Sequence, residues 1–185
     1  MLINCALYLC EICDYKTCSA VIQSGRLACS DEESLNYAAL CSIEGCTAYE
    51  LNDLEKCRKN FETFFRIQEK LLSNDDIEVR NIPSSLSTGS TPFSLLIQRS
   101  TSFHHMGVLE CASDNLEAAL EHFLRAAAIR IKSGDSASNL LANTYLRMSR
   151  VHFNKQEYKT AFELLQKAEF LYLRVSDGEA PFMAQ

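Results

Sequence analysis

Proline and glycine are scarce in this sequence: its 185 residues include only 3 Pro and 6 Gly. Together with a hydrophobic content of 47%, this scarcity excludes a disordered chain, because disordered chains are poor in apolar residues and rich in chain-breaking ones. The length and the apolar content indicate one globular or solenoid domain.

Clusters of basic residues are also missing. The 18 Lys and Arg residues are outnumbered by 24 Asp and Glu residues, which gives a formal net charge of −6. A surface that follows nucleic-acid phosphates concentrates Lys and Arg. We therefore expect no nucleic-acid partner.

The sequence lacks a recognisable signal peptide or membrane-spanning segment. Its first ten residues are mostly apolar, but no basic residue precedes them, and the acidic Glu11 and Asp14 follow too early for either kind of segment. We interpret this stretch as the buried face of a helix. The 9 cysteines are odd in number and lie in helical patterns, which favours reduced thiols and a cytoplasmic protein.

What the sequence does contain is helical periodicity. From Asn115 onward apolar residues recur at steps of three and four, as on one face of an α-helix, and the segments after Asn52 and Gln156 repeat this pattern. A shorter helical segment precedes each, at about 37–49, 95–111 and 140–153, with a polar turn between the two helices. No segment alternates as a strand would. The sequence predicts an all-α fold of antiparallel helix pairs.

One residue spacing recurs in these helix pairs. A small residue on the first helix is followed twelve residues later by Cys or Ala, and four residues further on by a large apolar residue. Because side chains at the closest approach of two helices must be small, the first two residues of each set are predicted to be structural repeat anchors. The three sets are Gly45, Cys57 and Phe61; Gly107, Ala119 and Phe123; and Ser149, Ala161 and Leu165.

These residues and their neighbours resemble the signature of the tetratricopeptide repeat (TPR) family. The resemblance implies a TPR-like superhelix of antiparallel helix pairs. Gly107 and Ser149 are 42 residues apart, which resembles the repeats of kinesin light chains and of the TPR regions in fungal nucleotide-binding switch proteins. The resemblance rests on Phe103, Met106, Gly107, Leu116, Ala119, Phe123 and Ala126; on Tyr145, Met148, Ser149, Tyr158, Ala161, Leu165 and Ala168; and, more weakly, on Cys41, Gly45, Ala48, Leu54, Cys57, Phe61 and Phe64.

The repeat register divides the chain into segments. Gly45 and Gly107 are 62 residues apart, so about 20 residues near 80–105 are surplus to a 42-residue repeat. A surface loop accounts for them, and an in-frame retained intron is the alternative. The two ends of the sequence fall inside repeats, which is typical of a fragment or a truncated gene model. The expected segments are a partial repeat helix plus an irregular segment at 1–36, a TPR-like repeat at 37–72, a loop or insertion at 73–98, TPR-like repeats at 99–133 and 140–175, and the start of a truncated repeat at 176–185.

The resemblance also implies a function. In TPR proteins the first helices line a concave groove that binds a partner peptide or helix, so we expect a protein-binding scaffold or sensor region, or a non-functional fragment of a longer TPR protein. Leu146 and Arg150 replace the Lys and Asn of the family's carboxylate clamp, which leaves a chaperone-adaptor role without motif support. The residues expected to contact a partner are Tyr49, His104, Asn143, Arg147, Arg150, Phe153 and Asn154.

Few residues have a pattern that indicates chemistry. Cys10 and Cys13 have CxxC spacing and Cys18 follows, but neither a second CxxC nor a neighbouring His completes a zinc site. A redox- or metal-responsive helical protein is therefore the alternative interpretation. His104 and His105 are not accompanied by a catalytic motif. We expect no enzyme, no catalytic residue, no cofactor and no metal, and the sequence leaves the oligomeric state open.

Overall fold

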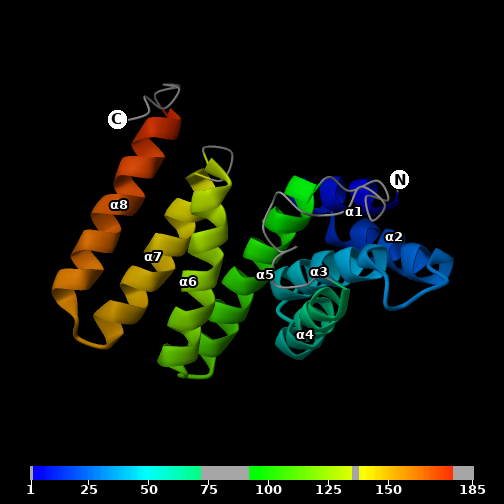
Figure 1. Ribbon diagram of the computed structural model, residues 1–185, viewed down its shortest axis with the longest axis horizontal. Coiled ribbons are helices and arrows are strands. Elements are labelled where there is room, and N and C mark those ends of the chain that lie inside the picture. The colour runs from blue at the N-terminus through cyan, green and yellow to red at the C-terminus, as the bar shows by residue number, and fades with distance from the viewer. Residues whose placement is uncertain (1, 72–91, 135–137, 177–185) are drawn as a thin grey trace. The chain divides into compact units, whose positions relative to one another are not determined.

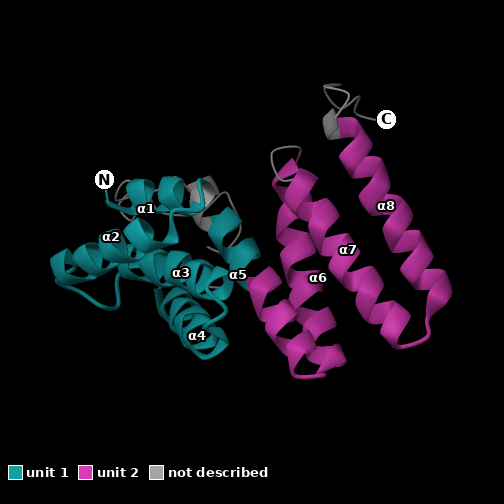
Figure 2. Cartoon of the chain, turned by 180° about the vertical axis from the view of Figure 1, so that it is seen from behind, with its two compact units in different colours: residues 1–102 teal, residues 103–185 magenta. Residues whose placement is uncertain are grey.

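The computed structural model describes residues 2–71, 92–134 and 138–176, and every regular element in these ranges is an α-helix (Figure 1). The predicted all-α fold class is therefore confirmed. The chain divides into two compact units, residues 1–102 and residues 103–185 (Figure 2).

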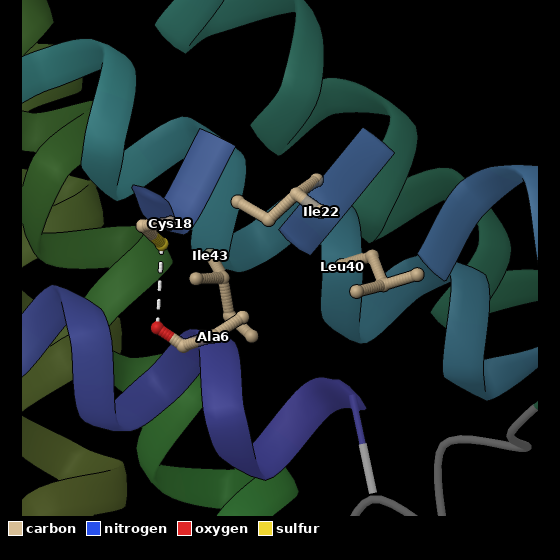
Figure 3. Packing of buried hydrophobic residues seen from close by; sticks show 5 residues of the cluster. All are labelled: Ala6, Cys18, Ile22, Leu40 and Ile43. Carbon is tan, nitrogen blue, oxygen red and sulfur yellow. Dashed lines mark hydrogen bonds between the residues drawn. The ribbon is translucent and has the colours of Figure 1, made fainter. Parts of the chain in front are cut away.

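The first unit begins with two helix pairs. Helices α1 (Leu2–Glu11) and α2 (Tyr15–Ala28) form the first pair, and α3 (Leu35–Glu50) and α4 (Leu54–Leu71) form the second. Helix α3 also packs against both helices of the first pair. The core between them consists of Ala6, Cys18, Ile22, Leu40 and Ile43 (Figure 3).

The irregular segment expected within residues 1–36 is wrong for most of its length, because α1 and α2 form a complete helix pair. Ala6, Cys18 and Ile22 repeat the spacing of the predicted anchor sets, and all three are fully buried. Ser19 and Ser24 each donate a hydrogen bond to the backbone carbonyl one turn earlier. The polar side chains of this segment are thus accommodated within a helix.

Helices α3 and α4 approach most closely at the predicted anchors. A Cβ atom on Gly45 would lie 2.6 Å from Cε1 of Phe61, and both Cys57 and Phe61 are fully buried. Arg26 of α2 adds a polar connection, since its guanidinium lies 2.8 Å from a carboxylate oxygen of Glu44. Small residues therefore set the helix spacing, and an ion pair links the first helix pair to the second.

Helix α5 (Pro92–Ala112) begins within the expected loop at 73–98, so that prediction is wrong from residue 92 onward. The remainder of that loop and the truncated repeat after residue 176 lie outside the described residues. The first part of α5 belongs to the first unit. There the Ser102 and Ser42 hydroxyls lie 2.9 Å apart, and Arg99 donates to Gln68 at 2.9 Å.

The second unit contains the rest of α5 together with α6 (Leu116–Lys132), α7 (Ser138–Asn154) and α8 (Tyr158–Ser176). A Cβ atom on Gly107 would lie 2.7 Å from Cε1 of Phe123. Ala119, Ser149 and Ala161, the other predicted anchors of this unit, are all buried. The anchor spacing therefore reports helix packing in this unit too.

The turns within the four helix pairs share one geometry. The residue seven positions after each first anchor has a positive φ, between 58° and 62°. The N–H of the next residue bonds to the carbonyl five residues earlier, which is the pattern of a Schellman motif. Three of these turns were predicted, and the first pair supplies a fourth. The positive-φ residues are Cys13, Asn52, Asp114 and Gln156.

Candidate functional site

A hollow of about 260 Å³ lies between α5 and α7 within the second unit. Helix α5 contributes small and apolar side chains to it, and α7 contributes polar and charged ones, with the buried Phe123 of α6 also in contact. We call this site the arginine hollow. It is lined by Val108, Cys111, Ala112, Phe123, Arg147, Arg150, Val151 and Asn154.

Helical spacing explains why these residues share one site. On α7, the lining residues Arg147, Arg150 and Asn154 are separated by three and four positions, so they occupy one face of the helix. Met148 and Ser149 lie between them in sequence but are buried against neighbouring helices. The same helix therefore presents a packing face and an accessible face.

The two arginines give the hollow its charge. Both Arg147 and Arg150 are exposed, and neither forms a salt bridge with any residue that the structure describes. Two other basic side chains of this unit are paired, Lys155 with Glu117 at 3.0 Å and Arg125 with Glu121 at 2.5 Å. Two guanidinium groups, each with donors suited to a carboxylate, are thus available beside an apolar surface.

Cys111 lies in the hollow as a neutral thiol. Burial raises its pKa, and the charges of Arg147 and Arg150 oppose this effect without cancelling it. The thiol therefore contributes mainly apolar surface. Its electrostatic coupling to both arginines places the two positive charges within reach of a group bound in the hollow.

Three of the seven residues predicted to contact a partner line this hollow, namely Arg147, Arg150 and Asn154. Tyr49 lies on α3 in the first unit, where it is half-buried. The structure therefore brings together three of the five α7 residues that the register selected, and Tyr49 stays a separate prediction.

Two further predicted residues are directed to α8. Asn143 accepts a hydrogen bond from the Tyr172 hydroxyl at 3.1 Å, and the Phe153 ring packs edge-on against Tyr158 with centroids 5.4 Å apart. Neither lines the arginine hollow.

The seventh predicted residue, His104, is part of the packing between helices. Its Nδ1 atom lies 3.3 Å from the hydroxyl of Thr144 and 3.4 Å from the guanidinium of Arg130. Burial, and then the charge of Arg130, lower the pKa of His104 to about 2. A neutral imidazole held in this way is suited to a structural role, so a partner contact through His104 stays untested and has little geometric support.

Arg130 is a polar residue in the core that the sequence interpretation missed. Only 1% of it is exposed, and its guanidinium donates to the carbonyl of Leu140 at 2.6 Å and to the Thr144 hydroxyl. The available signal was its position three residues after Ala127, on the buried stripe of α6. It connects α6 to the start of α7.

Two of the amino-terminal thiols, Cys10 and Cys18, have the environment of packed side chains, whereas Cys13 is exposed. Burial raises the pKa of Cys10 and of Cys18, and the Cys18 thiol donates to the carbonyl of Ala6 at 3.3 Å (Figure 3). Across the described residues, no group of three or more His, Cys, Asp or Glu side chains is arranged to hold a metal ion. Raised pKa values also lower the thiolate fraction that redox chemistry requires.

No helix within the described ranges has the length and apolar character needed to cross a membrane. Residues 98–172 match the tetratricopeptide repeat family. This stretch includes every residue of the arginine hollow and the anchors Gly107, Ala119, Ser149 and Ala161, so it supports TPR-type helix pairs there. No curated protein is similar enough to count as a relative.

Proposed function

We propose that this protein binds a segment of a partner protein in the arginine hollow. Tetratricopeptide repeats generally mediate protein–protein interaction, and the hollow lies entirely within the stretch that matches them. The observation that carries the proposal is the pair of unpaired guanidinium groups beside an apolar hollow between two first helices.

The lining predicts the chemistry of the bound segment. Val108, Ala112 and Val151 offer apolar surface to one aliphatic or aromatic side chain. Arg147 and Arg150 offer donors to a neighbouring Asp or Glu carboxylate, and the Asn154 amide can both donate to and accept from a peptide backbone. The preferred segment therefore combines one large apolar residue with at least one acidic residue.

Electrostatics supplies a measurable signature. Exposed charge pairs weaken with salt because the screening length falls to about 8 Å at physiological ionic strength. Binding to the arginines should therefore weaken as salt is added, while the apolar contact should not. A salt-sensitive affinity that loses its salt dependence when an arginine is removed would identify these contacts.

The experiment is a selection of displayed random peptides on the whole chain, followed by titration of the selected peptides. Arg147→Ala and Arg150→Ala should each weaken binding about tenfold. This change is equivalent to about 1.4 kcal/mol, which is close to the lower limit of about 1.5 kcal/mol for a hydrogen bond to a charged group. Lys159→Ala is the matched control, since it removes one positive charge from an exposed position on α8 outside the hollow.

Two outcomes would contradict the proposal. Selected peptides could bind both arginine variants as tightly as the unmodified protein, or they could lack acidic residues altogether. A role as the sensor region of a larger signalling protein, and the likeness to the 42-residue repeats of kinesin light chains and fungal proteins, stay predictions.

A further inference from the structure

A second accessible surface lies on α8 and the adjoining side of α7. It surrounds a hollow of about 490 Å³, and large apolar side chains are exposed on it, with Phe162 at 60% and Leu173 at 56%. We call it the α8 face. Its apolar members are Leu146, Phe162, Leu165, Tyr172 and Leu173.

Two of these positions, Leu165 and Tyr172, correspond one repeat earlier to positions that a helix covers, whereas Leu173 corresponds to Ile131, which is 57% exposed. Phe123 lies 42 residues before Leu165, and Arg130 lies 42 residues before Tyr172. Both are almost fully buried. The covering element is α7, whose Tyr145, Met148 and Val151 pack on the cluster that contains Phe123.

The preceding joint, in the first unit, uses equivalent positions. Ser42 on α3 meets Ser102 on α5, just as His104 on α5 meets Thr144 on α7 one repeat later. Two joints of this chain thus bury part of the surface that corresponds to the α8 face under the next first helix. This recurrence identifies the kind of element that fits the α8 face, namely a helix that presents apolar residues as α7 does.

Helix α1 presents such residues to solvent. When Ala6 of α1 is aligned with the anchor Ser149 of α7, three residues of α1 fall at the positions of the α7 residues that cover Phe123. Leu2, Cys5 and Tyr8 then correspond to Tyr145, Met148 and Val151. Leu2 and Tyr8 are 39% and 60% exposed, and Cys5 is exposed as well. Ile12 extends the stripe and is also exposed.

The corresponding residues of α5 show what this stripe normally does. Phe103, Met106 and Leu109 occupy the same register relative to Gly107, and all three are buried. The accessible stripe of α1 is therefore the helix half of an inter-repeat joint, and the α8 face is the other half.

From these two complementary halves we infer that the α8 face of one copy of this protein binds α1 of a second copy. The contact is head-to-tail because the two surfaces differ, so it does not close as a twofold dimer. It buries apolar side chains in the register that the chain uses internally. The inference does not depend on binding at the arginine hollow.

The test uses one charge on each surface. Phe162→Glu alters the α8 face, Tyr8→Glu alters α1, and Leu27→Glu is the control, because Leu27 is 90% exposed on α2 and belongs to neither surface. Sedimentation velocity of the unmodified chain and of Leu27→Glu should show assemblies that grow with concentration. Each of the other two variants alone should remain monomeric.

Mixing the two single-surface variants gives the decisive result. One intact α8 face and one intact α1 stripe remain between them, so the mixture should form a 1:1 dimer that does not extend further. Far-UV circular dichroism of each variant checks that it is folded, and Phe162→Ser provides a second change should the glutamate unfold the protein.

Three results would overturn the inference. The unmodified chain could remain monomeric at every concentration, in which case any occupant of the α8 face is a different protein. Leu27→Glu could disrupt assembly as strongly as Phe162→Glu does. The mixture of Tyr8→Glu and Phe162→Glu could remain monomeric, which would show that an intact α8 face does not bind an intact α1.

Discussion

Replacing Gly107 with alanine should destabilise the protein through one specific contact. The new Cβ atom would lie 2.7 Å from Cε1 and 2.8 Å from Cδ1 of Phe123, whereas carbon atoms in contact are normally about 3.5–4.0 Å apart. The ring must therefore move by about 1 Å. Phe123 is fully buried beside Ala119, Met148 and Val151, so this movement displaces its neighbours.

Two opposing effects set the magnitude. Overpacking a well-filled core costs about 1–3 kcal/mol, while alanine favours the helix over glycine by about 0.8–1.0 kcal/mol. The net expectation is a loss of about 1 kcal/mol in the free energy of unfolding. The sign should reverse once the ring is gone. In a Phe123→Val background, Gly107→Ala should increase stability by up to about 1 kcal/mol.

Urea unfolding followed by far-UV circular dichroism measures this reversal as a shift of the midpoint. Gly25→Ala is the matched control, because the atoms nearest to its Cβ would be the methyl groups of Leu40 at 3.1 Å, which is farther than the ring atoms that a Cβ atom on Gly107 would meet. That variant should be neutral or slightly stabilised. A stabilising effect of Gly107→Ala in the unmodified protein, or the same effect with and without the Phe123 ring, would refute the packing role of the anchor.

Two further predictions concern buried titratable groups. The pKa of His104 is lowered to about 2. The contribution of His104 to the free energy of unfolding is therefore fully present above the unfolded pKa of about 6.5, and it falls by about 1.4 kcal/mol for each pH unit below that value. His104→Gln should flatten this acid dependence in urea unfolding, and an unchanged pH slope would contradict the prediction. Burial raises the pKa of Cys57 to about 12. Iodoacetamide should therefore label the exposed Cys5 and Cys13 in the folded protein, and Cys57 only after unfolding, which peptide mass spectrometry would detect. Rapid labelling of Cys57 in the native state would count against its burial.

The helix pairs that contain glycine or serine anchors could be predicted because the signal is local. Each signal consists of a small residue, a second small residue twelve positions later, and the polar turn between their two helices. All of these residues belong to one helical hairpin. The first pair was missed because Ala6 is less distinctive than glycine, and because the polar residues of α2 suggested a loop. In the structure, the Ser19 and Ser24 hydroxyls each donate a hydrogen bond to a backbone carbonyl on the preceding turn of the same helix.

A departure from the family signature has a similar local explanation. Glu110 stands where the family usually has an aromatic residue, and only 9% of it is exposed. Its carboxylate accepts a hydrogen bond from the Asn115 side chain at 3.0 Å. The hydrogen bond between Glu110 and Asn115 therefore connects the end of α5 to the beginning of α6. It takes the place of the packing contact that an aromatic side chain would make at position 110.

The candidate site could be predicted only in part, because register selects a helix face but not the partners of each side chain. Arg147, Arg150 and Asn154 follow from the repeat on α7 alone. The inward placement of His104 depends on Arg130 and Thr144, which lie 26 and 40 residues away. Contacts across that distance are set by how successive helix pairs pack.

Helix α7 shows why binding residues can vary while the fold persists. Met148 and Ser149 are buried against neighbouring helices, whereas Arg147 and Arg150, adjacent to them in sequence, line the accessible hollow. A change at either arginine removes no core contact, so we expect its effect to fall on the proposed binding. A change at an anchor alters the helix spacing and acts on the hollow only through the position of the whole helix. If the hollow binds a partner as proposed, the arginine face can change while the packing positions stay fixed.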